Sequence, residues 1–328
     1  ACAPNTGGEY LLFARAGGRG GTGTPSDRHN NLLRATTEGI SAVLGGCHAL
    51  ALPAFDRAES PESALPARMA RNIQFLLRHE AYLDLVADPG GGSYYLEALT
   101  DQQAAAAWKL FQEIEAKGGF AACYGELIQA VGEARMGKEK ALARQKQVLV
   151  GINKYPNTGE VLPPPERDMR AGDLFQGIGG EGMRAADRFE RLRAQVDGIG
   201  AERGRRLKAF FLRFGDARMS SARVIFSRNL IGAAGFEIVE NTQPEDLPPS
   251  VEEAKAARPE LLVLCSADPD YFAEAPALIR ELRNTLPETV ILIAGKPTGA
   301  ETLPADDFLF AGMDAIAFLE TWLPKVIH

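Results

Sequence analysis

Two glycine-rich segments match GxGxxG, a pattern that lets a protein backbone approach the pyrophosphate of a dinucleotide. The first, Gly18 to Gly23, follows an apolar run and precedes a helix, but Pro25 stands where that helix should already be running. The next expected strand ends near Asp56, far beyond the spacing of about 20 residues at which a ribose-binding acid follows. The second match, Gly177 to Gly182, has no strand before it. We interpret neither segment as a nucleotide site.

Histidines and cysteines are few and scattered. The histidines are His29, His48, His79 and His328, and the cysteines are Cys2, Cys47, Cys123 and Cys265. No two histidines have the spacing of metal ligands on a helix, none lies beside an obvious serine or cysteine nucleophile, and no two cysteines have metal or redox spacing. We therefore predict no catalytic residue and no metal site, and we interpret the cysteines as reduced thiols of a cytoplasmic protein.

The segment Asp88 to Tyr95, DPGGGSYY, is a third candidate. It follows the apolar run Tyr82 to Val86, which we expect to form a strand, and barrel enzymes place their active sites just after their strands. A tight glycine-rich turn between a strand and a helix is the simpler interpretation, and we prefer it.

Strands and helices are expected to alternate in the first part of the chain. The expected strands are 10–16, 49–55 and 82–86. Three helices are expected: one that begins near Ser26, one at 67–80 and one at 100–117. This alternation indicates parallel strands joined by crossover helices. Three such units cannot close an eight-stranded barrel, which takes roughly 250 residues. We predict that residues 1–154 form the C-terminal part of a TIM barrel, whose open edges another segment must cover.

Composition changes after residue 154. Residues 155–205 are proline-rich and then glycine-rich, and we predict a linker with one helix near 183–196. Residues 206–328 become regular again, with expected strands at 207–214, 236–240, 260–266, 289–295 and 306–310 and a last helix at 315–326. Five such units predict an α/β domain with a flavodoxin-like, doubly wound parallel sheet.

Overall composition excludes several classes of protein. The chain has 328 residues, of which 45% are hydrophobic, and a formal net charge of −7. It has no basic run of the kind that binds nucleic acid and no apolar run long enough to span a membrane. We expect a globular protein with neither partner.

Four stretches resemble the methylmalonyl-CoA mutase family. They are 31–38 (NLLRATTE), 70–74 (ARNIQ), 88–97 (DPGGGSYYLE) and 150–155 (VGINKY). The resemblance covers nearly the whole chain but only the later half of a full family subunit. It implies the end of a substrate-binding barrel followed by a cobalamin-binding domain, with adenosylcobalamin held between the two.

The positions at which that family docks its cofactor differ in this chain. Where the family has Asp-x-His-x-x-Gly, with the histidine as axial ligand of cobalt, the chain has Asp216, Arg218 and Ser221. A guanidinium offers no lone pair to a metal. Ser266 lies in Cys265-Ser266-Ala267-Asp268, which adds an acid where the family has Ser-Ser-Leu, while 294–298 and the glycine-free 318–320 replace glycine-rich turns. We interpret Asp216, Arg218, Ser221 and Ser266 as positions of a vacated cobalamin site.

This pattern is similar to that of the small, non-catalytic subunit of the heterodimeric bacterial mutases. The resemblance implies a structural subunit that binds no cofactor and stabilises a larger catalytic subunit, which carries adenosylcobalamin and isomerises methylmalonyl-CoA to succinyl-CoA. Two alternatives stay open. One is an active mutase chain whose missing barrel strands come from elsewhere, and the other is a flavodoxin-like regulator that binds a small molecule.

Overall fold

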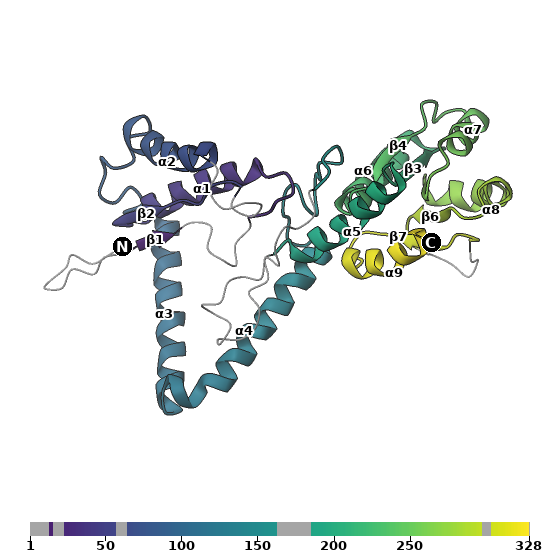
Figure 1. Ribbon diagram of the computed structural model, residues 1–328. Helices are drawn as coiled ribbons and strands as arrows, with labels where there is room; N and C mark the ends of the chain where they lie inside the picture. The colour runs from purple at the N-terminus through teal and green to yellow at the C-terminus, as the bar shows by residue number, and fades with distance from the viewer. Residues whose placement is uncertain (1–12, 16–22, 57–63, 163–184, 297–302, 328) are drawn as a thin grey trace, which may run out of the picture. The chain divides into compact units, whose positions relative to one another are not determined.

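A computed structural model describes residues 13–15, 23–56, 64–162, 185–296 and 303–327 (Figure 1). The chain forms two compact units. The first comprises Ala1–Gly137 with Asp168–Ala185, and the second comprises Lys138–Arg167 with Ala186–His328. The domain and linker boundaries placed at residues 154 and 205 from the sequence stay predictions.

A short parallel strand pair and two helices make up the start of the first unit. Strand β1 (Phe13–Arg15) pairs with β2 (Ala49–Ala51), with Phe13 opposite Ala49. Helix α1 (Asn30–Leu44) packs on α2 (Ala64–His79), because each presents an apolar face to the other, and Ala35, Ile73 and Leu77 are buried there. The parallel pairing and both helices agree with the sequence-based expectation.

The expected third strand, Tyr82 to Val86, is wrong. This segment is a turn that follows α2, in which the amide of Leu83 donates to Leu77 O and that of Leu85 donates to Tyr82 O. Tyr82 has a φ of +53°, outside the β region. A strand exists only where a neighbour supplies its ladder of hydrogen bonds, and no described residue does so here.

Two long helices follow this turn. Helix α3 (Tyr94–Ala116) begins at Tyr94, six residues before the expected start at residue 100, and α4 (Phe120–Ala143) is not among the expected helices. They are joined at Gly118 and Gly119, whose φ values of +100° and +82° are accessible to glycine. Figure 1 shows α3 and the part of α4 that belongs to the first unit diverging from this corner.

The second unit is built on a five-stranded parallel sheet. Its strands are β3 (Lys208–Arg213), β4 (Glu237–Glu240), β5 (Leu261–Cys265), β6 (Val290–Ala294) and β7 (Asp307–Leu309). They lie in the order β4-β3-β5-β6-β7. The first strand, β3, thus lies inside the sheet, with β4 on one side of it and β5 on the other. All five expected strands are present.

Helices cover both faces of this sheet. Every residue of β5 and β6 is buried, as continuous apolar strands of a parallel sheet should be. Phe210, Leu262 and Ile291 form one core with α7 (Leu247–Ala257) and α8 (Asp268–Thr285). Residues that alternate with these face the other side, where α6 (Ala217–Ala233) crosses the strands.

The last helix, α9 (Ala315–Ile327), packs against α5 (Asp187–Arg203). Residues 318–320 lie inside α9 and form no turn, which corrects the comparison of this segment with a glycine-rich turn. Helix α5 corresponds to the helix expected near 183–196. None of the described helices is both long enough and apolar enough to cross a membrane.

Part of the predicted linker is hydrogen-bonded to α5 and α6. The guanidinium of Arg193, whose side chain is 2% exposed, donates to the carbonyl oxygens of Asn157 (2.8 Å) and Glu160. The amide of Tyr155 donates to Asn229 Oδ1 at 2.8 Å. Residues 155–160 therefore belong to the second unit, while 163–184 lie outside the described residues.

Candidate functional site

The loops after β3 and β5 meet where the order of the strands reverses. Ligands of doubly wound sheets bind at such a point, beyond the carboxyl ends of the strands. Asp216, Arg218 and Ser221 follow β3, and Ser266 follows β5. The structure therefore brings all four positions to the same edge of the sheet, which we call the switch point.

Asp216 is the N-cap of α6. Its carboxylate Oδ1 accepts a hydrogen bond of 2.7 Å from the amide of Met219 and satisfies one of the unpaired donors of the first turn. The side chain therefore stabilises the helix that carries the other two positions.

Arg218 lies on the first turn of α6 and is exposed. Its guanidinium can donate hydrogen bonds and carry charge but cannot coordinate a metal. The three described histidines all belong to the first unit, and His328 lies outside the described residues. No described histidine can therefore replace the missing one within the second unit.

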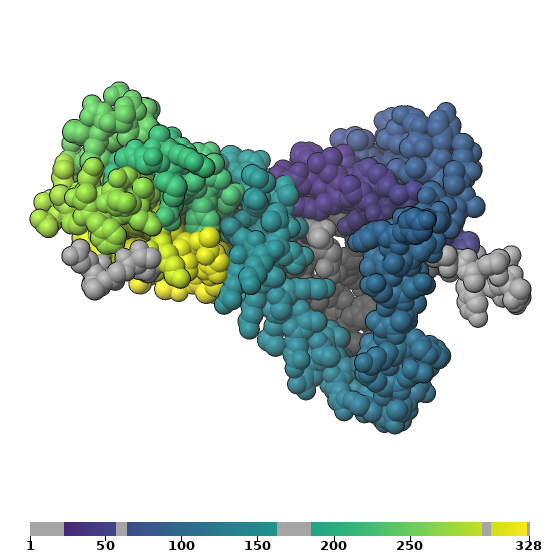
Figure 2. All heavy atoms as spheres, turned by 180° about the vertical axis from the view of Figure 1, so that it is seen from behind, coloured from purple at the N-terminus to yellow at the C-terminus, as the bar shows by residue number. Residues whose placement is uncertain are grey.

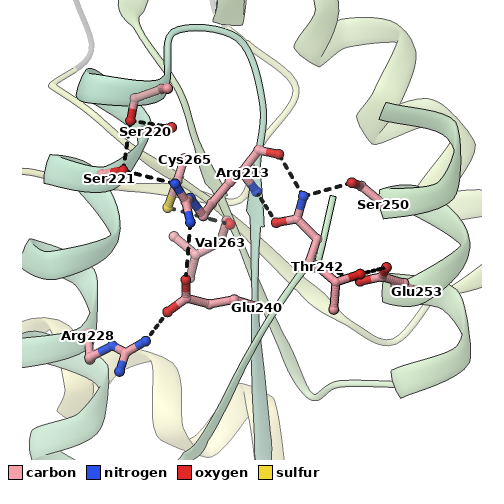
Figure 3. Close-up of polar contacts among 12 residues, drawn as sticks. Arg213, Ser220, Ser221, Arg228, Glu240, Thr242, Ser250, Glu253, Val263 and Cys265 are labelled. Atoms are coloured by element: carbon pink, nitrogen blue, oxygen red, sulfur yellow. Dashed lines mark hydrogen bonds and ion pairs between the residues drawn. The ribbon is translucent and has the colours of Figure 1, made fainter. Parts of the chain in front are cut away.

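Ser221 takes part in a polar cluster between β3, β4 and α6, drawn in Figure 3. Arg213 at the end of β3 donates to Ser221 Oγ at 2.9 Å, and Ser221 Oγ donates to Ala217 O at 2.7 Å. Arg213 and Arg228 both pair with the carboxylate of Glu240. The hydroxyl of Ser221 is thus used within the domain.

Ser266 is fully buried and joins the two loops. Its Oγ lies 2.7 Å from Phe214 O and 2.7 Å from Oδ2 of Asp270. The same carboxylate accepts a hydrogen bond of 3.1 Å from the amide of Asp216. These hydrogen bonds, led by that from Ser266, lower the pKa of Asp270 below its ordinary value.

Tyr271 supports this contact from beneath. Its Oη accepts a hydrogen bond of 2.7 Å from the amide of Ser266 and lies 2.8 Å from Ala294 O at the end of β6. Burial raises the pKa of this phenol far above its ordinary value. It therefore stays protonated and ties the ends of β5 and β6 together.

An ion pair between α6 and α8 lies across the same edge. Arg223 Nη2 of α6 is 2.7 Å from Asp268 Oδ1 at the start of α8. Gly295 follows β6, and a Cβ placed on it would lie 3.5 Å from each of these two side chains. The acid that the sequence adds at this edge is therefore neutralised by Arg223.

Cys265, the last residue of β5, is buried and carries a free thiol. Its burial raises its pKa well above the ordinary range of a thiol. A protonated, inaccessible thiol is neither a nucleophile nor a metal ligand, and no described residues form a group of three or more histidine, cysteine or acidic side chains around a metal site.

Asp216, Ser221 and Ser266 at the switch point are thus hydrogen-bonded to other groups of the domain. Sequence reasoning missed Arg213, Asp270 and Tyr271, which bind the named positions. It also missed Glu240, which pairs with Arg213. The signal available for Asp270 and Tyr271 was their place in the first turn of a helix after a buried strand, where side chains face the neighbouring loop.

Other candidates from the sequence have simple roles. The turn 88–93 begins α3: the amide of Ser93 donates to Gly90 O, and a Cβ on Gly91 would lie 2.7 Å from Asp88 Oδ2. This confirms the tight glycine-rich turn, although no strand precedes it. Of the two GxGxxG matches, only Gly23 falls within the described residues.

A sequence model of methylmalonyl-CoA mutase matches residues 11–174, half of the chain. The chain belongs to the methylmalonyl-CoA mutase family. Among its relatives are proteins named methylmalonyl-CoA mutase small subunit, from Porphyromonas gingivalis, 33% identical over 290 residues (86% of this chain, 46% of the relative), and from Streptomyces virginiae, 33% identical over 305 residues (92% and 48%). A protein named methylmalonyl-CoA mutase from Rhizobium meliloti is 42% identical over 131 residues (39% and 18%).

These matches differ in extent. The family model ends before the five-stranded sheet, whereas the alignments with the small subunits cover most of this chain. The chain nevertheless spans about half the length of these curated relatives.

Proposed function

We propose that this chain is a structural subunit of a methylmalonyl-CoA mutase. It stabilises a larger catalytic subunit, which carries adenosylcobalamin and isomerises methylmalonyl-CoA to succinyl-CoA, and it binds no cofactor itself. The observation that carries this proposal is the exposed Arg218 at the position where the family resemblance implies an axial imidazole. The names of the relatives that align with most of the chain support it.

We propose the family's two folds for the two units. The order β4-β3-β5-β6-β7 places the first strand of the domain second and its neighbour first, as in the flavodoxin-like order 2-1-3-4-5. The parallel pair β1-β2 with helices α1 and α2 supports a piece of a TIM barrel.

The residues of the switch point do not fit cobalamin. Axial ligation needs a nitrogen lone pair, which the guanidinium at position 218 lacks. Ser221, Ser266 and Asp270 already bind other groups of the domain. We therefore derive no catalytic step through cobalamin in this chain.

The face for a protein partner is best sought on α3 and the part of α4 that belongs to the first unit, whose side chains are visible in Figure 2. None of the 23 residues of helix α3 is buried. Its large apolar side chains Trp108, Leu110 and Phe111 are 61%, 53% and 49% exposed. Helices in proteins owe most of their stability to packing, and large exposed apolar surfaces mark interaction sites. We propose that the larger mutase subunit covers this face, in the cytoplasm, where the free thiols of Cys47 and Cys123 would stay reduced.

Co-expression with a larger, histidine-bearing family member tests the proposal. The two chains should co-purify, and the complex should melt at a higher temperature than this chain alone. Replacement of Trp108 and Phe111 by serine should weaken the complex, whereas replacement of Phe272, 39% exposed on α8, should not. Failure of the wild-type chains to associate would contradict the proposal.

An active mutase chain is the second candidate, because the 42% identical relative from Rhizobium meliloti is named as a mutase without the words small subunit. This candidate predicts that the wild-type chain binds adenosylcobalamin with a protein nitrogen on cobalt, which an absorption spectrum would reveal.

A further inference from the structure

Two carboxylates from one helical turn bridge the switch point. Asp268 and Asp270 both lie on the first turn of α8. Asp268 reaches Arg223, within α6, and Asp270 reaches the amide of Asp216, the N-cap of α6. Each bridge therefore joins the start of α8 to α6 across the ends of β3 and β5.

The bridge made by Asp270 leaves no room around Gly215. This glycine has a φ of +65°, and a Cβ placed on it would lie 2.6 Å from Cγ of Asp270 and 2.6 Å from Oγ of Ser266. Cβ atoms in proteins essentially never lie within 3.0 Å of a non-bonded heavy atom. The carboxylate of Asp270 therefore lies directly against the backbone of the loop after β3.

The bridge between Asp268 and Arg223 closes the side nearer β6. Arg223 and Asp268 are 21% and 50% exposed, and both lie within contact distance of a Cβ on Gly295. An ion pair at this exposure contributes little to stability by itself. Its effect is to place a charged pair across the end of β5, where an incoming group would have to displace it.

The turn that carries both carboxylates is anchored from below. Tyr271, next to Asp270 and 2% exposed, binds the amide of Ser266, and its Oη lies within hydrogen-bond distance of Ala294 O. Moving Asp270 would therefore disturb the ends of three strands, β3, β5 and β6, and its effect would extend beyond one side chain. A buried network of satisfied groups of this kind rigidifies its surroundings.

We infer that the first turn of α8 is a clamp, formed by Asp268 and Asp270 on Arg223, Asp216 and Ser266, that closes the switch point to cobalamin independently of Arg218. The inference rests on the proposed function and deepens it. The cobalamin site has lost its axial ligand, and side chains of the domain also fill it. It follows that an imidazole restored at position 218 does not restore binding while the clamp is intact.

Spectral titration with adenosylcobalamin tests this consequence. Wild-type protein and the variant Arg218→His are titrated side by side, each with its folded state checked by circular dichroism. The clamp predicts that Arg218→His shows no spectrum of histidine-ligated cobalt and retains no cofactor on gel filtration. If this variant binds and the wild type does not, the clamp is refuted while the proposed function stands. If the wild type binds, the proposed function itself fails.

Hydrogen exchange tests the clamp without any cofactor. Asp268→Asn removes the charge of the Arg223 pair, and Glu320→Gln is the matched control, because Glu320 on α9 pairs with Arg188 on α5 at 2.8 Å. We expect exchange of the amides at the start of α6, including that of Met219, to rise about two- to fivefold in Asp268→Asn and to stay unchanged in the control. Equal protection of this segment in both variants would overturn the clamp.

Discussion

Gly215 and Asp270 lie in direct contact, with the aspartate carboxylate against the glycine's backbone. The contact joins the loop after the first strand of the sheet to the helix after the third. It requires a residue without a side chain at 215 and an acid at 270, so that each position constrains the other. The domain can keep its fold at this edge without any ligand.

Replacement of Gly215 by alanine should therefore be costly. The new Cβ would clash with Asp270 and Ser266, and the φ of +65° is unfavourable for any residue with a side chain. We expect a loss of about 2–4 kcal/mol in the free energy of unfolding, measured by urea denaturation.

The matched control is Gly204→Ala. Gly204 also has a φ of +65°, but its Cβ would meet nothing within 4 Å. This variant should lose only the backbone term, about 1–2 kcal/mol. Equal losses in the two variants would show that the contact with Asp270 carries no energy.

Acid should weaken the edge through Asp270. Hydrogen bonds from Ser266 and the amide of Asp216 lower the pKa of Asp270 from its ordinary value of 3.8. Its stabilising contribution is complete above that unfolded-state value and is lost as the pH falls through the lower folded value. In urea titrations between pH 7 and pH 3, the stability difference between the wild type and Asp270→Asn should be constant at high pH and shrink below about pH 4. A difference that grows on acidification would contradict this assignment.

Much of the second unit could be predicted from sequence. Apolar runs such as Leu261–Cys265 are long, bounded by polar residues and buried on both faces, so their pattern alone indicates strands of a parallel sheet. The first unit was harder. Tyr82 to Val86 has the composition of a strand, but a strand depends on a neighbour that the sequence does not reveal. Helix α4 carries little amphipathic pattern, so periodicity gave no signal for it.

The site divides in the same way. Arg218 could be recognised from sequence because the family motif names the position. The partners of Ser221 and Ser266 could not, since Arg213 and Asp270 come from other elements and approach only in the folded sheet.

Arg193 should be essential for holding residues 155–160 on the second unit. Its buried guanidinium donates to two carbonyl oxygens of this segment and lies 3.8 Å from Asp197 Oδ2. Replacement by methionine leaves these acceptors unpaired, and we expect a loss of about 2–4 kcal/mol together with faster proteolysis in 155–162.

Arg191→Met serves as the comparison, since Arg191 is 65% exposed and pairs only with Asp187 among the contacts described. We expect a change of less than about 1 kcal/mol and no new cleavage. Identical proteolysis of the two variants would argue against a special role for Arg193.

Thiol chemistry should distinguish the described cysteines. Burial raises the pKa of Cys265 and hides its sulfur, whereas Cys47 is partly exposed. With a thiol reagent at pH 8, peptide mapping by mass spectrometry should find Cys47 modified first and Cys265 modified only on unfolding. Early modification of Cys265 in the folded chain would mean that the core of the sheet opens readily.

The number of cobalamin molecules per complex tests the central claim most directly. Native mass spectrometry of the purified complex between this chain and a histidine-bearing catalytic subunit, loaded with excess adenosylcobalamin, would count them. A structural subunit predicts one cobalamin for each pair of chains, released with the catalytic subunit when the complex is dissociated. Two cobalamins for each pair, or one that stays with this chain, would contradict it.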